Sequence, residues 1–190
     1  KSTRRVLIMY FEAIPKIQYD SVGAGNPKVV TNLMRRVAVR AKIRTNTLLF
    51  DTYSIKEGET PEIIAHKLYG DSELHWIVLL MNDITDRYHQ WPMNYSQFNQ
   101  YIADRYDDID GTHHYELAQS SGNTDTKIEV YNNSALYSGD TDFYNGATVI
   151  TNREYEESLQ DERRQIRLLD PKYVEDFVEE YITIMNETSI

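Results

Sequence analysis

The sequence predicts an α+β fold: a compact βαα module, flanking short β segments, an N-terminal extended arm and a C-terminal amphipathic helix. Three observations favour this class. Residues 52–55 alternate polar and apolar side chains, which is the period of a half-buried strand. Residues 61–81 then repeat apolar side chains at helical spacing. Residues 174–185 carry an apolar stripe opposite an acidic one.

The composition restricts the classes of protein to which this chain can belong. The chain has 190 residues and is 41% hydrophobic, which is enough for the core of one or two small domains. Its net charge of -10 argues against a dedicated nucleic-acid binder. Because the chain has no cysteine, a disulfide scaffold, a thiolate metal site and a cysteine nucleophile are excluded. No apolar run approaches the ~20 residues that span a bilayer, so we expect no membrane contact.

Residues 1–50 are predicted to form an N-terminal strand, an arm and a basic strand. The strand covers residues 6–11, and the glycine-containing residues 16–30 form an extended arm or loop. Thr31 is expected to begin a short helix. From residue 37 apolar and basic side chains alternate, which predicts a strand with one basic face. The basic residues of this segment are Arg36, Arg40, Lys42 and Arg44.

That basic face has several interpretations. It is either a solvated surface, a partner for acidic side chains on a neighbouring strand, or a contact for an acidic protein. A nucleic-acid contact is the least favoured, because the whole chain is acidic. A second strand over residues 48–55 leads into the central module.

Residues 51–92 form that module. Gly58 suits the turn at residues 56–59, because such a turn often needs a positive φ. Thr60 is a candidate N-cap with Pro61 at the first helical position, and Gly70 ends the helix. Asp71 or Ser72 caps a second helix, which stops at Asn82. The apolar positions expected inside are Ile63, Ile64, Ala65, Leu68, Leu74, Ile77, Val78 and Met81.

Residues 93–151 are predicted to form an aromatic connector helix and a small β region. Asn94 caps the helix, which carries Phe98 and Ile102 on one side. Short β segments are expected at residues 115–117, 128–131 and 147–151, separated by turn-forming residues.

Residues 152–190 are predicted to form a charged helix, a strand at residues 165–169 and an amphipathic helix. Asp170 and Pro171 begin this last helix. Its apolar stripe consists of Val174, Phe177, Val178, Tyr181, Ile182 and Met185. The stripe packs on its own domain or docks on a partner.

No arrangement of residues predicts catalysis, a metal site or a cofactor, so we expect no enzyme activity. His66 and His75 lack the spacing of a zinc-protease pair. Glu62 and His66, four residues apart on a helix, indicate a surface pair. His113 and His114 are adjacent in a predicted strand and are expected on opposite faces, so they would not bind one ion together.

The central module resembles a LysM module, a βααβ unit that often binds N-acetylglucosamine polymers. Tyr53-Ser54-Ile55, the Gly58-Glu59-Thr60 turn, Ile64-Ala65 with Leu68-Tyr69-Gly70, and Leu80-Met81-Asn82 carry this resemblance. Two features differ. Pro61 stands where an apolar residue is usual, and no second strand follows Asn82. The resemblance implies a glycan-binding alternative, with peptidoglycan as the ligand.

Most of the chain resembles the gene product 53 family, the LysM-like baseplate wedge subunits of T4-type contractile-tailed phages. The similarity is strongest at residues 52–92 and 154–185. It is carried by Leu68-Tyr69-Gly70-Asp71, Leu74, Trp76, Leu79-Leu80-Met81-Asn82, Tyr88, Trp91-Pro92, Asp161-Glu162-Arg163-Arg164-Gln165-Ile166-Arg167, Phe177 and Tyr181-Ile182.

This resemblance implies a structural subunit of the virion tail baseplate, assembled in the host cytoplasm, that clamps neighbouring wedges around the hub. It implies six copies per baseplate and contacts with the core-bundle and sheath-nucleating wedge subunits, and with hub proteins. No cofactor, nucleic acid or membrane is implied. The candidate interface residues are Arg36, Arg40, Lys42, Arg44, Trp76, Tyr88, Trp91, Phe177 and Tyr181.

Overall fold

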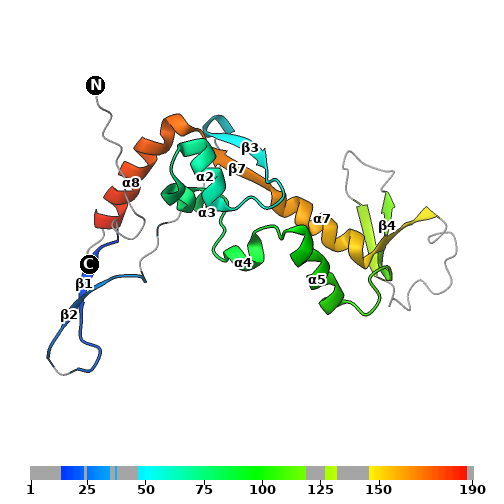
Figure 1. Ribbon diagram of the computed structural model, residues 1–190, viewed down its shortest axis with the longest axis horizontal. Coiled ribbons are helices and arrows are strands. Elements are labelled where there is room, and N and C mark those ends of the chain that lie inside the picture. The colour runs from blue at the N-terminus through cyan, green and yellow to red at the C-terminus, as the bar shows by residue number, and fades with distance from the viewer. Residues whose placement is uncertain are drawn as a thin grey trace. The chain divides into compact units, whose positions relative to one another are not determined.

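The computed structural model describes residues 14–23, 25–34, 37, 47–118, 127–131 and 146–187. Helices and strands are mixed along the chain, which confirms the α+β class (Figure 1). The chain divides into two compact units: residues 1–91 with 165–190, and residues 92–164. The first unit therefore takes its sequence from both ends of the chain.

A two-stranded antiparallel sheet lies at the centre of the first unit. Strand β3 (Phe50–Ser54) pairs with β7 (Gln165–Leu169), and Tyr53 lies opposite Ile166. Figure 1 shows the two strands side by side, β3 in cyan and β7 in orange. Between them in the sequence come α2 (Pro61–Tyr69) and α3 (His75–Met81), which follow β3 directly. The bounds predicted for residues 165–169 are correct, but the pairing with β3 was not predicted.

The predicted turns and caps of this unit are present. Gly58 has φ +75°, and Gly70 ends α2 with φ +77°, both in the left-handed region that favours glycine. Thr60 caps α2, since its side chain accepts a hydrogen bond from the Ile63 N–H, and Pro61 occupies the first turn. Asp71 caps a short 3₁₀ helix, η3 (Ser72–Leu74), that leads into α3.

The interior of the first unit contains two clusters of apolar side chains. Ile64, Ala65 and Val78 are buried in one cluster together with residues of β7. Ile77 and Met81 are buried in the other, which includes the apolar side of α8 (Val174–Glu187). Of the residues expected inside, Ile63 is the exception, because its side chain is 41% exposed.

Helix α8 follows a 3₁₀ turn, η4 (Pro171–Tyr173), capped by Asp170 as predicted. The stripe on α8 packs on the chain's own core. Its buried members are Val174, Val178, Tyr181 and Met185.

The N-terminal part differs from its prediction. The expected arm contains an antiparallel hairpin of β1 (Lys16–Tyr19) and β2 (Lys28–Thr31), drawn in blue in Figure 1. The helix start expected at Thr31 is wrong, because Thr31 pairs with Lys16 as the last residue of β2. The strand expected at residues 6–11 lies outside the described residues, as does the basic strand except for Val37. Leading into β3 is a 3₁₀ turn, η2 (Thr47–Leu49).

In the residues that the structure describes, the second unit combines the helices α5 and α7 with a three-stranded antiparallel sheet of order β5-β4-β6. The strands are β4 (Thr112–Ala118), β5 (Lys127–Tyr131) and β6 (Thr148–Thr151). Asn94 forms the predicted cap of α5 (Tyr95–Arg105) in a reciprocal capping box with Gln97, and Phe98 and Ile102 are buried. Helix α7 (Asn152–Arg164) follows β6.

A short helix that was not predicted, α4 (Arg87–Gln90), follows α3 in the first unit and is capped by Asp86. Among the residues that the structure describes, no helix is both long and apolar enough to cross a membrane.

Candidate functional site

The structure separates the candidate interface residues into three groups. Trp76, Trp91 and Tyr181 are 6%, 7% and 3% exposed, so their side chains pack inside the first unit and present little surface to a partner. The Tyr88 side chain is 90% exposed, and Phe177 is half-buried beside Trp76. The basic residues Arg36, Arg40, Lys42 and Arg44 lie outside the described residues.

A buried carboxylate, Glu59, holds the turn between β3 and α2. Its Oε2 accepts hydrogen bonds from the Tyr53 hydroxyl at 2.8 Å and the Lys56 N–H at 2.9 Å. Its Oε1 accepts a bond from Lys67 Nζ at 2.5 Å. Burial alone would raise the pKa of Glu59, but these donors outweigh it and lower the pKa to about 2.

Trp91, which directly follows the short helix α4, contacts the same turn. Its indole Nε1–H donates a hydrogen bond to the Glu59 carbonyl oxygen at 2.9 Å, inside the core. The packing role of Trp91 is therefore accompanied by a polar contact that fixes the ring's orientation.

Glu62 was expected to pair with His66. Instead, its carboxylate forms an ion pair with Arg87 of α4, at 2.5 Å from Nη1, while His66 is exposed. The partner comes from a helix that the sequence pattern did not reveal, so the expected pairing is wrong.

The second unit buries a carboxylate of its own. Glu156 on α7 is 2% exposed, and its Oε1 accepts a hydrogen bond from the Tyr106 hydroxyl at 2.8 Å. The same oxygen lies 3.3 Å from Arg105 Nη1. Burial, together with the hydrogen bond to Glu156, raises the pKa of Tyr106 to about 12.

His113 and His114 were expected on opposite faces of their strand, and this expectation is wrong. Their Nδ1 atoms lie 2.8 Å apart, and the rings meet edge to face. The register of β4 against β6 shifts between Thr112 and His114, and such an irregularity disturbs the alternation of adjacent side chains. The His113 ring stacks on Tyr155, with centroids 3.8 Å apart.

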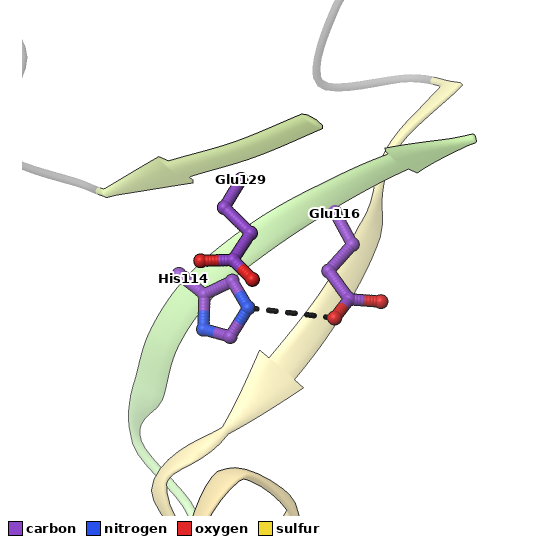
Figure 2. Close-up of side chains that lie close together, drawn as sticks. All are labelled: His114, Glu116 and Glu129. Carbon is purple, nitrogen blue, oxygen red and sulfur yellow. Dashed lines mark ion pairs between the residues drawn. The ribbon is translucent and has the colours of Figure 1, made fainter. Parts of the chain in front are cut away.

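Three side chains of the small sheet converge beside this pair: His114 and Glu116 from β4, and Glu129 from β5 (Figure 2). A ligand atom of each lies within 4.8 Å of the others. His114 is buried, Glu116 is half-buried and Glu129 is exposed. Lys127 pairs with Glu116 and is the main cause of the lowered pKa of that carboxyl.

Sequence reasoning missed these polar clusters. For Glu59, a signal was available, because a Glu between a turn glycine and an N-cap is well placed to accept backbone N–H bonds. For His114, Glu116 and Glu129, the i, i+2 spacing in a predicted strand places two of them on one face. The third depends on strand register, which the sequence did not provide.

The first unit thus combines a sheet completed by a strand from the far end of the chain, an aromatic core and an exposed hairpin. The family model of base plate wedge protein 53 matches residues 9–184. The chain belongs to this family, and it is therefore a structural protein of the phage baseplate wedge and part of the virion.

One relative is the baseplate wedge protein gp53 of Enterobacteria phage T4. It is 25% identical over 145 residues, which cover 72% of this chain and 74% of the relative. This match agrees with the family assignment. Neither comparison supports the glycan-binding alternative.

Proposed function

We propose that this chain is a non-enzymatic subunit, present in six copies, that holds neighbouring baseplate wedges together around the hub. The observation that carries the proposal is the β1–β2 hairpin. Seven of its eight strand residues are exposed, and the eighth, Thr31, is half-buried. Apolar side chains remain uncovered along it and just beyond it: Ile17, Tyr19, Val22, Val29, Val30, Leu33 and Met34.

An isolated two-stranded hairpin is at best marginally stable in water. Exposed apolar groups gathered on one short element are typical of surfaces that are covered by a partner. The hairpin therefore gains its stability from contact with another protein of the baseplate.

Charge indicates what kind of surface that protein presents. Residues 1–50 contain ten Lys and Arg against two Asp and Glu, whereas residues 51–190 contain ten against 28. Such an asymmetry within one chain is typical of a basic arm that binds an acidic partner. We propose that the hairpin and the basic residues after it bind a wedge protein. The surface of that protein combines acidic and apolar side chains.

The proposal also accounts for the LysM resemblance. The elements β3, α2, α3 and β7 follow one another in the order of a βααβ unit, and we infer that β7 takes the place of the second LysM strand. Helix α4 and the second unit lie between α3 and β7 in the sequence. A LysM-like module interrupted in this way would serve protein contact, with Tyr88 and the half-buried Phe177 as further contact points.

Electron cryo-microscopy of the assembled tail tests the proposal. The chain is expected once per wedge, with the hairpin seated on a neighbouring wedge protein. A structure in which the chain lies outside the wedge ring, or in which the hairpin faces solvent, would overturn it.

A variant pair sharpens this test. Tyr19→Ser combined with Val29→Ser removes two exposed apolar side chains of the hairpin. It is expected to leave the melting temperature within a degree or two and to reduce incorporation into baseplates at least tenfold. Val149→Ser, on an exposed position of β6, is the matched control and is expected to assemble normally.

A further inference from the structure

We propose that His114, Glu116 and Glu129 form a binding site for a divalent transition metal ion, Zn²⁺ or Mn²⁺, on the β4–β5 strand pair. This inference is independent of the proposed wedge contacts, because it concerns the small sheet of the second unit alone.

Strand register explains why the three side chains meet. Glu116 of β4 lies directly opposite Glu129 of β5, so their side chains share a face of the sheet. His114 precedes Glu116 by two residues and lies on that same face. Figure 2 shows the carboxylates of Glu116 and Glu129 close to the His114 ring, with a dashed line joining the ring to Glu116.

The charges of this cluster favour a cation. Two carboxylates directly opposite each other on neighbouring strands repel. Lys127 neutralises one charge, with its Nζ 2.5 Å from Glu116 Oε2. The other oxygen of that carboxylate, Oε1, faces His114 Nε2 at 3.6 Å. The two carboxylates and Lys127 together retain one negative charge, which a divalent ion would reverse.

The histidine is arranged as a ligand. When His114 Nδ1 carries the ring proton, it donates to His113 Nδ1 at 2.8 Å. The Nε2 atom then carries a lone pair and lies near both carboxylates. Metal-bound histidines commonly donate their second N–H to such an outer partner, which fixes the ring's orientation. Stacking of His113 on Tyr155 holds that partner in place.

The donor set indicates the class of metal. One imidazole nitrogen and two carboxylate oxygens suit Zn²⁺ or Mn²⁺ better than a soft ion that requires thiolates. Water would complete the coordination, because the three ligands leave positions open and Glu129 is exposed. A bound ion would link β4 to β5 and so stabilise the small sheet. The competing explanation is that Lys127 alone balances the charge of the two carboxylates and that no metal ion binds there.

Calorimetric titration of the full chain, without a histidine tag, with ZnCl₂ and separately with MnCl₂ tests the site. At least one of the two metals is expected to bind saturably to the protein, with one ion per chain. Glu116→Gln and Glu129→Gln keep the side-chain shape and are each expected to weaken binding at least tenfold. Two controls, Glu157→Gln on α7 and His89→Gln on α4, are expected to bind as the unchanged protein does.

Two further readouts make the outcome decisive. The metal is expected to raise the melting temperature of the unchanged protein but not of Glu129→Gln, which alters an exposed side chain and is expected to fold normally. Nitrogen-15 spectra are expected to show the Nε2 resonance of His114 shifting on metal addition. Saturable binding that is unchanged in Glu129→Gln, or no binding of either metal, would overturn the proposal and leave Lys127 as the cluster's only cation.

Discussion

Asn82 and Arg167 exchange two hydrogen bonds across a separation of 85 residues in the chain. The Asn82 Nδ2–H donates to the Arg167 carbonyl oxygen at 2.8 Å, and the Arg167 N–H donates to Asn82 Oδ1 at 2.9 Å. Nδ2 also donates to the Val78 carbonyl oxygen. The side chain at the end of α3 thereby acts as one more hydrogen-bonded partner for β7.

Asn82→Ala is expected to destabilise the first unit by about 2–3 kcal/mol, since the side chain makes three hydrogen bonds and each contributes roughly 1 kcal/mol. Urea unfolding measures the effect. Asn26→Ala, in the exposed loop of the hairpin, is the control and is expected to change the unfolding free energy by less than about 0.5 kcal/mol. Equal effects of the two substitutions would show that the Asn82 amide does not anchor β7.

This pair of residues also shows where sequence reasoning ends. Local patterns predicted β7 with its correct bounds, and they predicted the caps at Thr60 and Gly70, because these depend on residues close together in the chain. No strand is predicted directly after Asn82, and no local pattern identifies the partner of β3. Strand pairing is decided by long-range packing, and residues 55–164, which include the whole second unit, separate the two strands in the sequence.

The polar clusters were hidden for a related reason. Charged residues in turns are normally exposed, so the local signal at Glu59 indicated bonds to backbone N–H groups but not burial. Its burial depends on Lys67 and on Trp91, which come from two different helical stretches. Glu129 meets His114 only through the register of β4 and β5. By contrast, the apolar stripe of α8 was readable, because it repeats within a single helix.

Tyr181 and Tyr88 are expected to behave in opposite ways. The Tyr181 ring is buried with its centroid 4.6 Å from that of Trp76, so Tyr181→Ala is expected to cost about 3–5 kcal/mol of unfolding free energy. Tyr88→Ala removes a side chain that is 90% exposed and is expected to cost less than about 0.5 kcal/mol.

Thermal unfolding of the two variants measures this difference, and baseplate incorporation provides the second readout. Under the proposed function, Tyr88→Ala folds normally and yet joins baseplates less efficiently. Normal incorporation of Tyr88→Ala would remove this residue from the proposed contact surface.

Tyr106→Phe tests the buried carboxylate of the second unit. The substitution keeps the ring but removes the hydroxyl that donates to Glu156, so a charge that is 2% exposed loses a hydrogen bond. We expect a loss of about 1–3 kcal/mol. Amide hydrogen exchange at Phe98 and Ile102 of α5 measures the stability of the second unit specifically. In a Glu156→Gln background the same substitution should cost less, and an equal cost would mean that the two side chains are not coupled. Tyr88→Phe is the exposed control.

The Glu59 carboxylate makes the free energy of unfolding depend on pH below 4.5. Because its pKa is lowered from 4.5 to about 2, its ionised form stabilises the fold above pH 4.5, and this contribution is lost as the pH falls towards 2. The effect is on the order of 2 kcal/mol, allowing for the exposure of Lys67. Unfolding free energies between pH 6 and 2 should therefore fall more steeply for the unchanged protein than for Glu59→Gln. Lys67→Met should flatten the same range, whereas Lys56→Met, which keeps the backbone N–H donor, should not. Parallel curves for the unchanged protein and Glu59→Gln would contradict this role.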